Sequence, residues 1–170
     1  MEAKKRRQLL LEKLESIFEP VTGAALAKEL GVSRQIIVGD IAILRAAGRE
    51  IYATPQGYIM SLKPQMNNVV AKFACRHDRE KMAKELAIII DNGGKVLDVI
   101  VEHSVYGEIK ANLMLSSRRE MEEFLNKLSD GAEPLSMVTG GVHLHTVGAS
   151  SRAVLANIEA ELKAEGILIN

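Results

Sequence analysis

The sequence predicts an α+β protein with two domains of different kinds. Hydrophobic residues make up 47% and charged residues 26% of its 170 positions, as in a globular chain that buries a core. The formal net charge is zero, yet residues 1–63 hold ten Lys or Arg against seven acids, which gives them +3 and leaves −3 for the remainder. Apolar residues follow helical spacing in the first part and both strand and helix spacing in the second. We therefore predict one domain over residues 1–63 and another over residues 69–170.

A linker is expected at residues 63–68, because Pro64 and the two asparagines that close this segment disfavour a continuing element. The single cysteine, Cys75, cannot form an internal disulfide, which indicates a reducing compartment. The apolar run near the start, at residues 9–11, is too short for a signal peptide or a membrane span. We therefore expect a cytoplasmic protein with no membrane partner.

The first domain is expected to begin with three helices. The first covers residues 4–18, the second is capped by Thr22 and ends at Leu30, and the third is capped by Ser33 and ends near residue 46. In the first and third helices apolar residues recur at i, i+4 and i+7, so each has one face for a core. Gly31 provides the turn between the second and third helices, which is the order of a helix-turn-helix.

A hairpin is expected after the third helix. Residues 50–53 and 58–60 are strand-like and flank residues 54–57, where Pro55 and Gly57 occupy the second and fourth positions of a type I turn. A helix-turn-helix followed by a hairpin makes a winged helix-turn-helix.

The residues of this domain also carry a resemblance to known regulators. The segments Gly31-Val32-Ser33-Arg34-Gln35, Asp40-Ile41, Leu44-Arg45, Gly48 and Gly57-Tyr58 resemble the winged helix of biotin-repressor and DeoR-like proteins. This resemblance covers residues 5–60 and implies that the third helix enters the major groove of double-stranded operator DNA. The expected DNA-binding positions are Ser33, Arg34, Gln35, Ile36, Val38, Gly39 and Arg49, with Arg45 as a further candidate.

These positions offer two kinds of contact. Arg34 and Gln35 can donate to phosphates or bases, whereas Ile36 and Val38 can contact thymine methyl groups. The alternative is that the winged helix binds another protein and that its arginines are merely solvated. The charge of +3 and the basic start at residues 4–7 favour phosphate binding.

The second domain alternates strands and helices. Strands are expected at residues 69–73, 96–101, 108–115, 142–147 and 167–169, and helices after the caps Asp78, Ser117 and Ser151. The order β-α-β-β-α-β, followed by α-β, predicts an α+β sandwich with a split βαβ element.

All four histidines lie in the second domain, and two of them form the motif His143-Leu144-His145. Side chains alternate along a strand, so both imidazoles lie on one face and can converge on one metal ion. His77 and Glu85 are candidates for the remaining ligands. On one helix they would be about 12 Å apart, so His77 must stand ahead of the helix, fold back, or come from another chain. Alternatively the two strand histidines are solvated or at the core edge, and Glu85 pairs with Lys81 on the surface.

A second resemblance extends over essentially the whole chain. The segments Arg76-His77-Asp78, Glu85-Leu86, Asp98-Val99-Ile100-Val101-Glu102-His103-Ser104-Val105-Tyr106-Gly107 and Gly140-Gly141-Val142-His143-Leu144-His145-Thr146 resemble the three-histidine (3H) domain. A winged helix followed by that domain resembles the niacin-responsive repressor family, NiaR. The resemblance implies one divalent transition metal per chain on His77, Glu85, His143 and His145. It also implies nicotinic acid as co-repressor, acting on genes of NAD biosynthesis or niacin uptake.

A nicotinate ligand suits these residues chemically. Its carboxylate or ring nitrogen can bind an open metal position, and Tyr106 can stack on the pyridine ring. Arg76 can pair with the carboxylate, and His103 can line the pocket or bond to a metal ligand. The His and carboxylate set suits zinc, nickel, iron or manganese.

Three functions are compatible with the sequence. The first is a ligand-responsive repressor that acts as a homodimer, since paired operator half-sites need two recognition helices. The second is a metal sensor of the same architecture, in which the ion itself is the signal. The third is a metal-dependent hydrolase, which is disfavoured because the chain has no nucleophile triad, phosphate loop or H-E-x-x-H motif.

Overall fold

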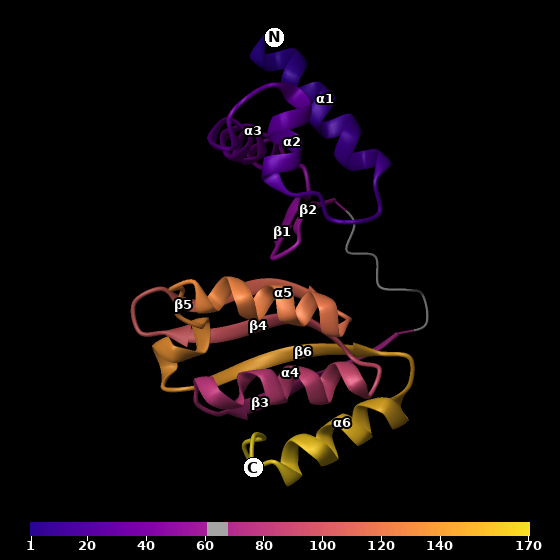
Figure 1. The fold of residues 1–170 in the computed structure, drawn as a ribbon, viewed down its shortest axis with the longest axis vertical. Coiled ribbons are helices and arrows are strands. Elements are labelled where there is room, and N and C mark those ends of the chain that lie inside the picture. The colour runs from indigo at the N-terminus through magenta and orange to yellow at the C-terminus, as the bar shows by residue number, and fades with distance from the viewer. Residues whose placement is uncertain (61–67) are drawn as a thin grey trace. The chain divides into compact units, whose positions relative to one another are not determined.

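The computed structural model describes residues 1–60 and 68–170. The chain divides into two compact units, Met1–Lys63 and Pro64–Asn170, which are considered separately (Figure 1). Most of the linker expected at residues 63–68 lies outside the described residues. None of the helices in the described part of the chain is both long and apolar enough to span a membrane.

The first unit contains the three expected helices and the expected hairpin. Helices α1 (Ala3–Ser16), α2 (Gly23–Leu30) and α3 (Arg34–Ala46) precede strands β1 (Tyr52–Thr54) and β2 (Gly57–Ile59). Thr22 and Ser33 cap α2 and α3 by accepting from the backbone N–H groups of Ala25 and Ile36, and Gly31 takes the left-handed conformation between the helices. The buried core comprises Leu10, Leu14, Leu26, Ala27, Ile37, Ile41, Leu44 and Ile51. The winged helix-turn-helix prediction is therefore confirmed.

Helix α1 ends earlier than the sequence indicates. It stops at Ser16, whereas apolar residues continue to Phe18. Phe18 is 86% exposed, so it adds nothing to the core that would extend the helix.

The wing, formed by β1 and β2, is hydrogen-bonded to the loop before α2. Tyr58 and Val21 exchange backbone hydrogen bonds of 2.8 and 3.0 Å. Gly57 has φ +134°, and a Cβ atom there would overlap the backbone of Val21. A side chain at this position would therefore push the wing away from the helices.

A buried ion pair holds α1 against α3. The Arg6 guanidinium donates to Asp40 from Nε at 2.6 Å and from Nη2 at 3.2 Å, and Arg7 donates to the same carboxylate at 3.4 Å. Asp40 is 3% exposed. Two of the four basic residues at the start of the chain, Arg6 and Arg7, thus bind Asp40 within the fold, and phosphate binding by the basic cluster stays a prediction.

Asp40→Ala is expected to lower the free energy of unfolding of the first unit by about 1–3 kcal/mol, because it leaves a largely buried guanidinium without its acceptor. Denaturant titration of the full chain measures this effect. Glu29→Ala is the matched control, since the Glu29–Lys13 pair is exposed and such pairs contribute about 0–1 kcal/mol. Equal losses in the two variants would contradict a structural role for Asp40.

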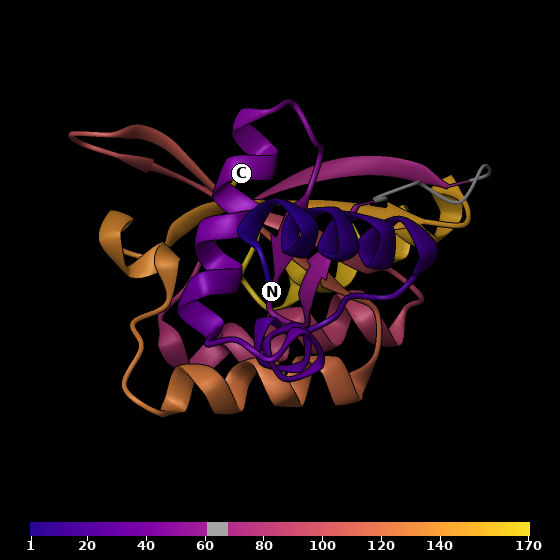
Figure 2. The same ribbon diagram turned by 90° about the horizontal axis from the view of Figure 1, so that it is seen from above.

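The second unit is a four-stranded sheet with helices on one face (Figures 1 and 2). Its elements are β3 (Val69–Arg76), η1 (Arg79–Lys81), α4 (Met82–Asp91), β4 (Lys95–His103), β5 (Gly107–Leu115), α5 (Arg118–Ser129), η2 (Leu135–Thr139), β6 (Val142–Ala149) and α6 (Arg152–Ala164). The strand order is β3-β6-β4-β5, and every neighbouring pair is antiparallel. Strand β6 therefore lies between β3 and β4, the split βαβ arrangement predicted from the sequence.

The core of this unit lies between the sheet and α4, α5 and α6. Phe73, Val99, Val147, Leu86 and Ile158 are among its buried members. Helix α5 opens with the expected capping box of Ser117 and Glu120. Gly94 passes so close to Ile89 and Ile158 that a Cβ atom there would lie 2.7–2.9 Å from their atoms.

Two strand predictions change in extent. Strand β3 continues to Arg76 rather than ending at residue 73, because β6 pairs with it as far as Arg76 and Val142. The last predicted strand, at residues 167–169, is reduced to a single bridge between Leu168 and Cys75. The longer β3 brings Cys75 directly opposite His143.

Candidate functional site

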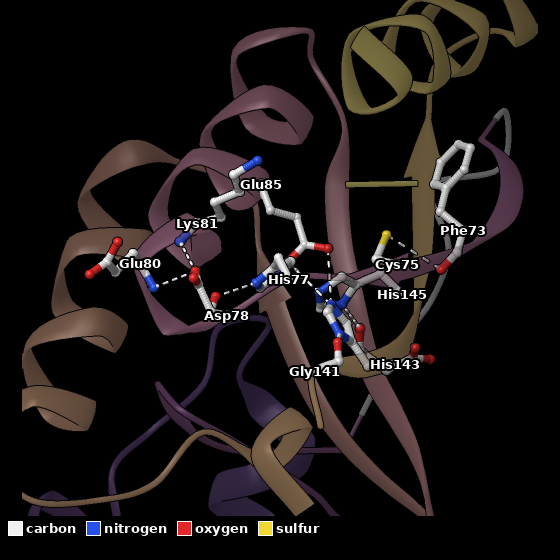
Figure 3. Close-up of polar contacts among 11 residues, drawn as sticks. Phe73, Cys75, His77, Asp78, Glu80, Lys81, Glu85, Gly141, His143 and His145 are labelled. Atoms are coloured by element: carbon white, nitrogen blue, oxygen red, sulfur yellow. Dashed lines mark hydrogen bonds and ion pairs between the residues drawn. The ribbon is translucent and has the colours of Figure 1, made fainter. Parts of the chain in front are cut away.

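Four side chains from three parts of the second unit meet at one point (Figure 3). The Glu85 carboxylate lies 2.5 Å from His77 Nε2, 3.0 Å from His143 Nε2 and 3.4 Å from His145 Nε2. Strand β6 carries His143 and His145 on its buried face, and α4 carries Glu85 in its first turn. The structure thus brings together the four residues that the sequence nominated as metal ligands.

His77 reaches the cluster because α4 starts later than Asp78. Asp78 caps the short 3-10 helix η1, accepting from the backbone N–H groups of Glu80 and Lys81, and α4 follows only from Met82. His77 therefore precedes the helix and folds back over Glu85, one of the arrangements left open by the sequence. The exposed pair of Glu85 with Lys81 does not form, since Glu85 is 1% exposed.

Each imidazole in the cluster is oriented by a backbone carbonyl. Nδ1 of His77, His143 and His145 lies 2.6, 2.8 and 2.7 Å from the carbonyl oxygens of Asp78, Gly141 and Asp98. A carbonyl oxygen can only accept, so each Nδ1 carries a proton and donates it. In a neutral imidazole the lone pair is then on Nε2, the atom that faces Glu85.

The cluster is buried, and the pKa values of Glu85, His77 and His145 are shifted by burial and by the contacts among these groups. Burial favours a neutral Glu85, but the charge of His145 and hydrogen bonds from the three histidines outweigh it, so the pKa of Glu85 falls well below its usual range. Burial lowers the pKa of His77 and of His145, yet Glu85 reverses this, and both pKa values are raised. The carboxylate is therefore ionised and favours positive charge at Nε2 of His77 and of His145.

Cys75 lies beside this cluster. Its ligand atom, a Glu85 carboxylate oxygen and a His143 ring nitrogen are all within 4.8 Å of one another. The thiol is fully buried and donates to the carbonyl oxygen of Phe73, and burial together with the Glu85 charge raises the pKa of Cys75. Cys75 also belongs to the apolar core, which agrees with the small buried hydrophobe expected from the sequence.

Gly141 fixes the approach of two ligands. It has φ +94°, and a Cβ atom there would overlap the carbonyl oxygen of His77. Its own carbonyl accepts from His143 Nδ1. One glycine thus allows the His77 loop to pass closely and orients the His143 ring.

A cavity of about 220 Å³ adjoins the cluster. His77, Glu85, His143 and His145 are among the residues that line it. The remaining wall is mainly apolar and comes from α4, β4, β5, α5 and the segment through η2: Met82, Leu86, Val99, Ala111, Leu113, Phe124, Leu128, Glu133, Pro134, Leu135 and Ser136. The arrangement provides four metal-capable donors facing a small, largely apolar chamber.

The three residues nominated for nicotinate lie outside that chamber. Arg76 is exposed at the end of β3, and Tyr106 is 79% exposed at the tip of the β4–β5 hairpin. His103 accepts at Nδ1 from the backbone N–H groups of Val105 and Tyr106, and its ring lies 5.1 Å from that of Tyr106. His103 lines a second, more open hollow, which it shares with His143. Their role in ligand binding stays a prediction.

The apolar wall of the chamber was not anticipated. Phe124 and Leu128 recur at i, i+4 on α5, a spacing that predicts burial without distinguishing a packed core from a cavity wall. Pro134, Leu135 and Ser136 lie in a segment with no periodic pattern. Only the pairing of β6 with β3 and β4 brings that segment beside the histidines.

In the first unit, the predicted DNA-binding positions from Ser33 to Gly39 lie at the start and in the first turns of α3, and Arg49 follows the end of that helix. Val38 is half-buried, whereas the others are exposed: Ser33, Arg34, Gln35, Ile36, Gly39 and Arg49. The candidate Arg45 donates from Nε to the carbonyl of Ile51 at 2.7 Å and lies 5.9 Å from the centre of the Tyr58 ring. It therefore ties the end of α3 to the wing.

Comparisons with known proteins agree with both units. Residues 6–59 match the model of a helix-turn-helix domain, and residues 70–170 match that of the 3H domain. The chain is 44% identical over 165 residues to the "Probable transcription repressor NiaR" of Thermotoga maritima, which covers 96% of this chain and 93% of that protein. It is 42% identical over 172 residues to the "Transcription repressor NadR" of Bacillus subtilis, which covers 99% of this chain and 95% of that protein.

These relatives are repressors rather than enzymes, and the match extends over both domains. The helix-turn-helix domain accounts for DNA binding, and the buried cluster of three histidines and Glu85 belongs to the domain that the relatives share. The chain is a member of the NiaR/NadR family of DNA-binding transcription repressors.

Proposed function

We propose that the protein is a homodimeric repressor that binds one divalent transition metal and one nicotinic acid molecule per chain and controls genes of NAD biosynthesis or niacin uptake. The metal is held by His77, Glu85, His143 and His145. The observation that carries this proposal is the convergence of three Nε2 atoms and one carboxylate in the wall of a small, mainly apolar cavity.

The case for a metal rests on the protonation of the rings. When the imidazoles are neutral and each Nδ1 donates to a carbonyl, three Nε2 lone pairs and the Glu85 carboxylate face one another in a buried space. Without a cation such groups repel, unless several imidazoles become charged at a high desolvation cost. A divalent cation satisfies all four donors, and carbonyls that fix the outer ring nitrogens are typical of metal-binding histidines. When bound, the ion supplies a positive charge with room for a further ligand.

The case for a small aromatic acid rests on the cavity. Its volume of about 220 Å³ is below the 300–1,000 Å³ typical of pockets for drug-sized ligands, so it suits a single ring rather than a dinucleotide. Phe124 and Leu128 line the cavity and can provide apolar contacts, and a metal on the histidine cluster can take the carboxylate or ring nitrogen. The names of the relatives also point toward niacin or NAD metabolism.

Isothermal titration tests this assignment. Nicotinate is expected to bind the metal-loaded full chain and to bind the chelator-treated chain at least about 10-fold more weakly, because a metal–carboxylate contact is lost. Nicotinamide, which lacks the negative charge, is the matched ligand control. Equal heats for nicotinate with and without metal would contradict a metal-bound co-repressor.

The same titration separates the proposal from a metal sensor. Absence of any nicotinate heat, combined with metal-dependent operator binding, would identify the ion itself as the signal. Alanine variants of Arg76, His103 and Tyr106 then report whether residues outside the cavity contribute. Of these three, His103 lines the second hollow, so loss of nicotinate affinity in His103→Ala would place the ligand at that hollow rather than in the cavity.

Arg34→Ala is expected to weaken operator binding by about 10-fold or more, because one good base contact contributes about 1–3 kcal/mol of discrimination. Fluorescence anisotropy measures the loss, with labelled DNA from upstream of a gene of NAD biosynthesis or niacin uptake as the probe. Arg119→Ala is the control, since Arg119 is an exposed arginine on α5 of the other domain. Unchanged affinity in Arg34→Ala at several salt concentrations would contradict the role of this position in the DNA interface.

A further inference from the structure

The sheet of the second unit has one face that its helices leave open. Helices α4, α5 and α6 pack on the side of Phe73, His143 and Val99 (Figure 2). On the opposite side, which we call the outer face, Ala74, Leu144 and Ile100 lie side by side on β3, β6 and β4. Of helices α4, α5 and α6, none lies on this side of the sheet, whereas Val138 and Thr139 of η2 line a hollow together with these three residues. Ala74 and Leu144 are half-buried and Ile100 is 5% exposed, so the centre of the outer face is apolar and is reached mainly through Ala74 and Leu144.

Charged side chains on the outer face are separated by sign. Lys72 and Arg76 are exposed on β3, at one edge, whereas Glu102 and Glu108 are exposed on β4 and β5, toward the other. Within the described parts of the chain none of these four side chains forms an ion pair. Of the remaining charges there, Asp98 and Lys110 pair with each other at 3.5 Å, and Lys95 lies opposite Gly148 at the far end of β4.

Strand register places these groups in level rows. One row runs Ala74, Leu144, Ile100 and Lys110 across the four strands. Two residues further along, Arg76 lies opposite Val142, and Glu102 lies opposite Glu108. Because β4 and β6 are antiparallel and Leu144 faces Ile100, Val142 is level with Glu102. The second row therefore has a cation at one end and two carboxylates at the other.

A second copy of the same face complements this pattern. Two copies can face each other across a two-fold axis that lies between their outer faces. If this axis is parallel to the strands and level with the boundary between β6 and β4, β3 of each copy lies over β5 of the other. Leu144 then meets Ile100 of the second copy, and Arg76 meets Glu108 of the second copy. Both contacts occur twice, as an isologous interface requires. Facing sheets pack about 10 Å apart in this way, with a rotation of about 30° from their twist.

We propose that the outer face is the homodimer interface, with a second copy of this chain as its occupant. This deepens the proposed repressor function by naming the surface that joins the two chains. The tip of the β4–β5 hairpin supports the same partner, because Val105 and Tyr106 are each 79% exposed. The two-fold operation carries that tip toward the end of β6 in the second copy, where Val138 is 54% exposed. Exposed apolar side chains at this rim would be covered on dimerisation.

Sedimentation equilibrium of the metal-loaded full chain tests the interface by charge reversal. Arg76→Glu and Glu108→Arg are each expected to raise the dimer dissociation constant at least about 10-fold, because each places like charges opposite one another twice. The double variant restores opposite charges and is expected to return the constant to about the wild-type value. Arg119→Glu, the same change on the helical side of this unit, is the control and should leave it unchanged.

Leu144→Lys provides a second test at the apolar centre. It is expected to give a monomer at concentrations where the wild type is a dimer, with metal content retained as evidence of folding. A monomeric wild-type chain, unchanged constants in the single variants, or no rescue in the double variant would each overturn the interface. Nicotinate titration of the Leu144→Lys variant is a separate readout, because Leu144 is not among the residues proposed for the ligand: retained heat would show that the ligand site stands whether or not the interface does.

Discussion

Glu85→Gln is expected to lower metal affinity by at least about 100-fold, a larger loss than the roughly 10–100-fold typical of groups that only support a ligand. Glu85 is the one anionic side chain among the four donors and touches all three imidazoles. Glutamine keeps the shape of the side chain but removes its charge. It also replaces one carboxylate oxygen with an NH2 group, a donor that would face the Nε2 atoms. Competition with a chromophoric chelator, together with metal stoichiometry, measures the change.

The matched control for this variant is Glu80→Gln. Glu80 is exposed in η1, five residues earlier, and loses the same charge without contacting the cluster. We expect its metal affinity to equal that of the wild type. If both variants bound metal as tightly as the wild type, Glu85 would be a structural partner of the histidines and the metal would lie elsewhere.

Gly141→Ala is expected to weaken metal binding although Gly141 is not a ligand. A methyl group there would overlap the His77 carbonyl oxygen and would have to be accommodated at φ +94°. The displacement moves His77 away from Glu85 and disturbs the carbonyl that orients His143. Since misplacing groups that orient ligands costs about 10–100-fold in affinity, a loss in that range is expected. The same chelator competition measures it.

Gly140→Ala separates the overlap from backbone strain. Gly140 also has a positive φ, +62°, but a Cβ atom there meets nothing within 4 Å. Both variants therefore carry the cost of a left-handed alanine, and only Gly141→Ala pushes on His77. Equal metal affinities in the two variants would contradict the role of this close approach.

Much of the fold could be predicted because its signals are local. Thr22, Ser33 and Ser117 each precede an apolar periodic run, and each caps the helix expected of it. Alternation along residues 142–147 places His143 and His145 on one face, which holds for any strand. Helix and strand ends depend on contacts that are not local in sequence: β3 gains three residues from its pairing with β6.

Only part of the site could be predicted from the sequence. The position of His77 and the orientation of the imidazoles depend on contacts between residues that are distant in the sequence. The separation of His77 from Glu85 left three arrangements open, and the position of η1 before α4 decides among them. The three carbonyls that orient the imidazoles come from the backbone, which any residue type can supply. Likewise, Arg6 looked like part of a phosphate-binding cluster, and only packing of α1 on α3 brings it to Asp40.

Anomalous diffraction from crystals of the metal-loaded chain, soaked with nicotinate, tests the metal centre most directly. We expect one peak per chain at the absorption edge of the metal, about 2.0–2.2 Å from Nε2 of His77, His143 and His145 and from a carboxylate oxygen of Glu85. Nicotinate density is expected in the adjoining cavity, against Phe124 and Leu128. A peak bound by other side chains, with these four still contacting one another directly, would contradict the metal-dependent co-repressor site.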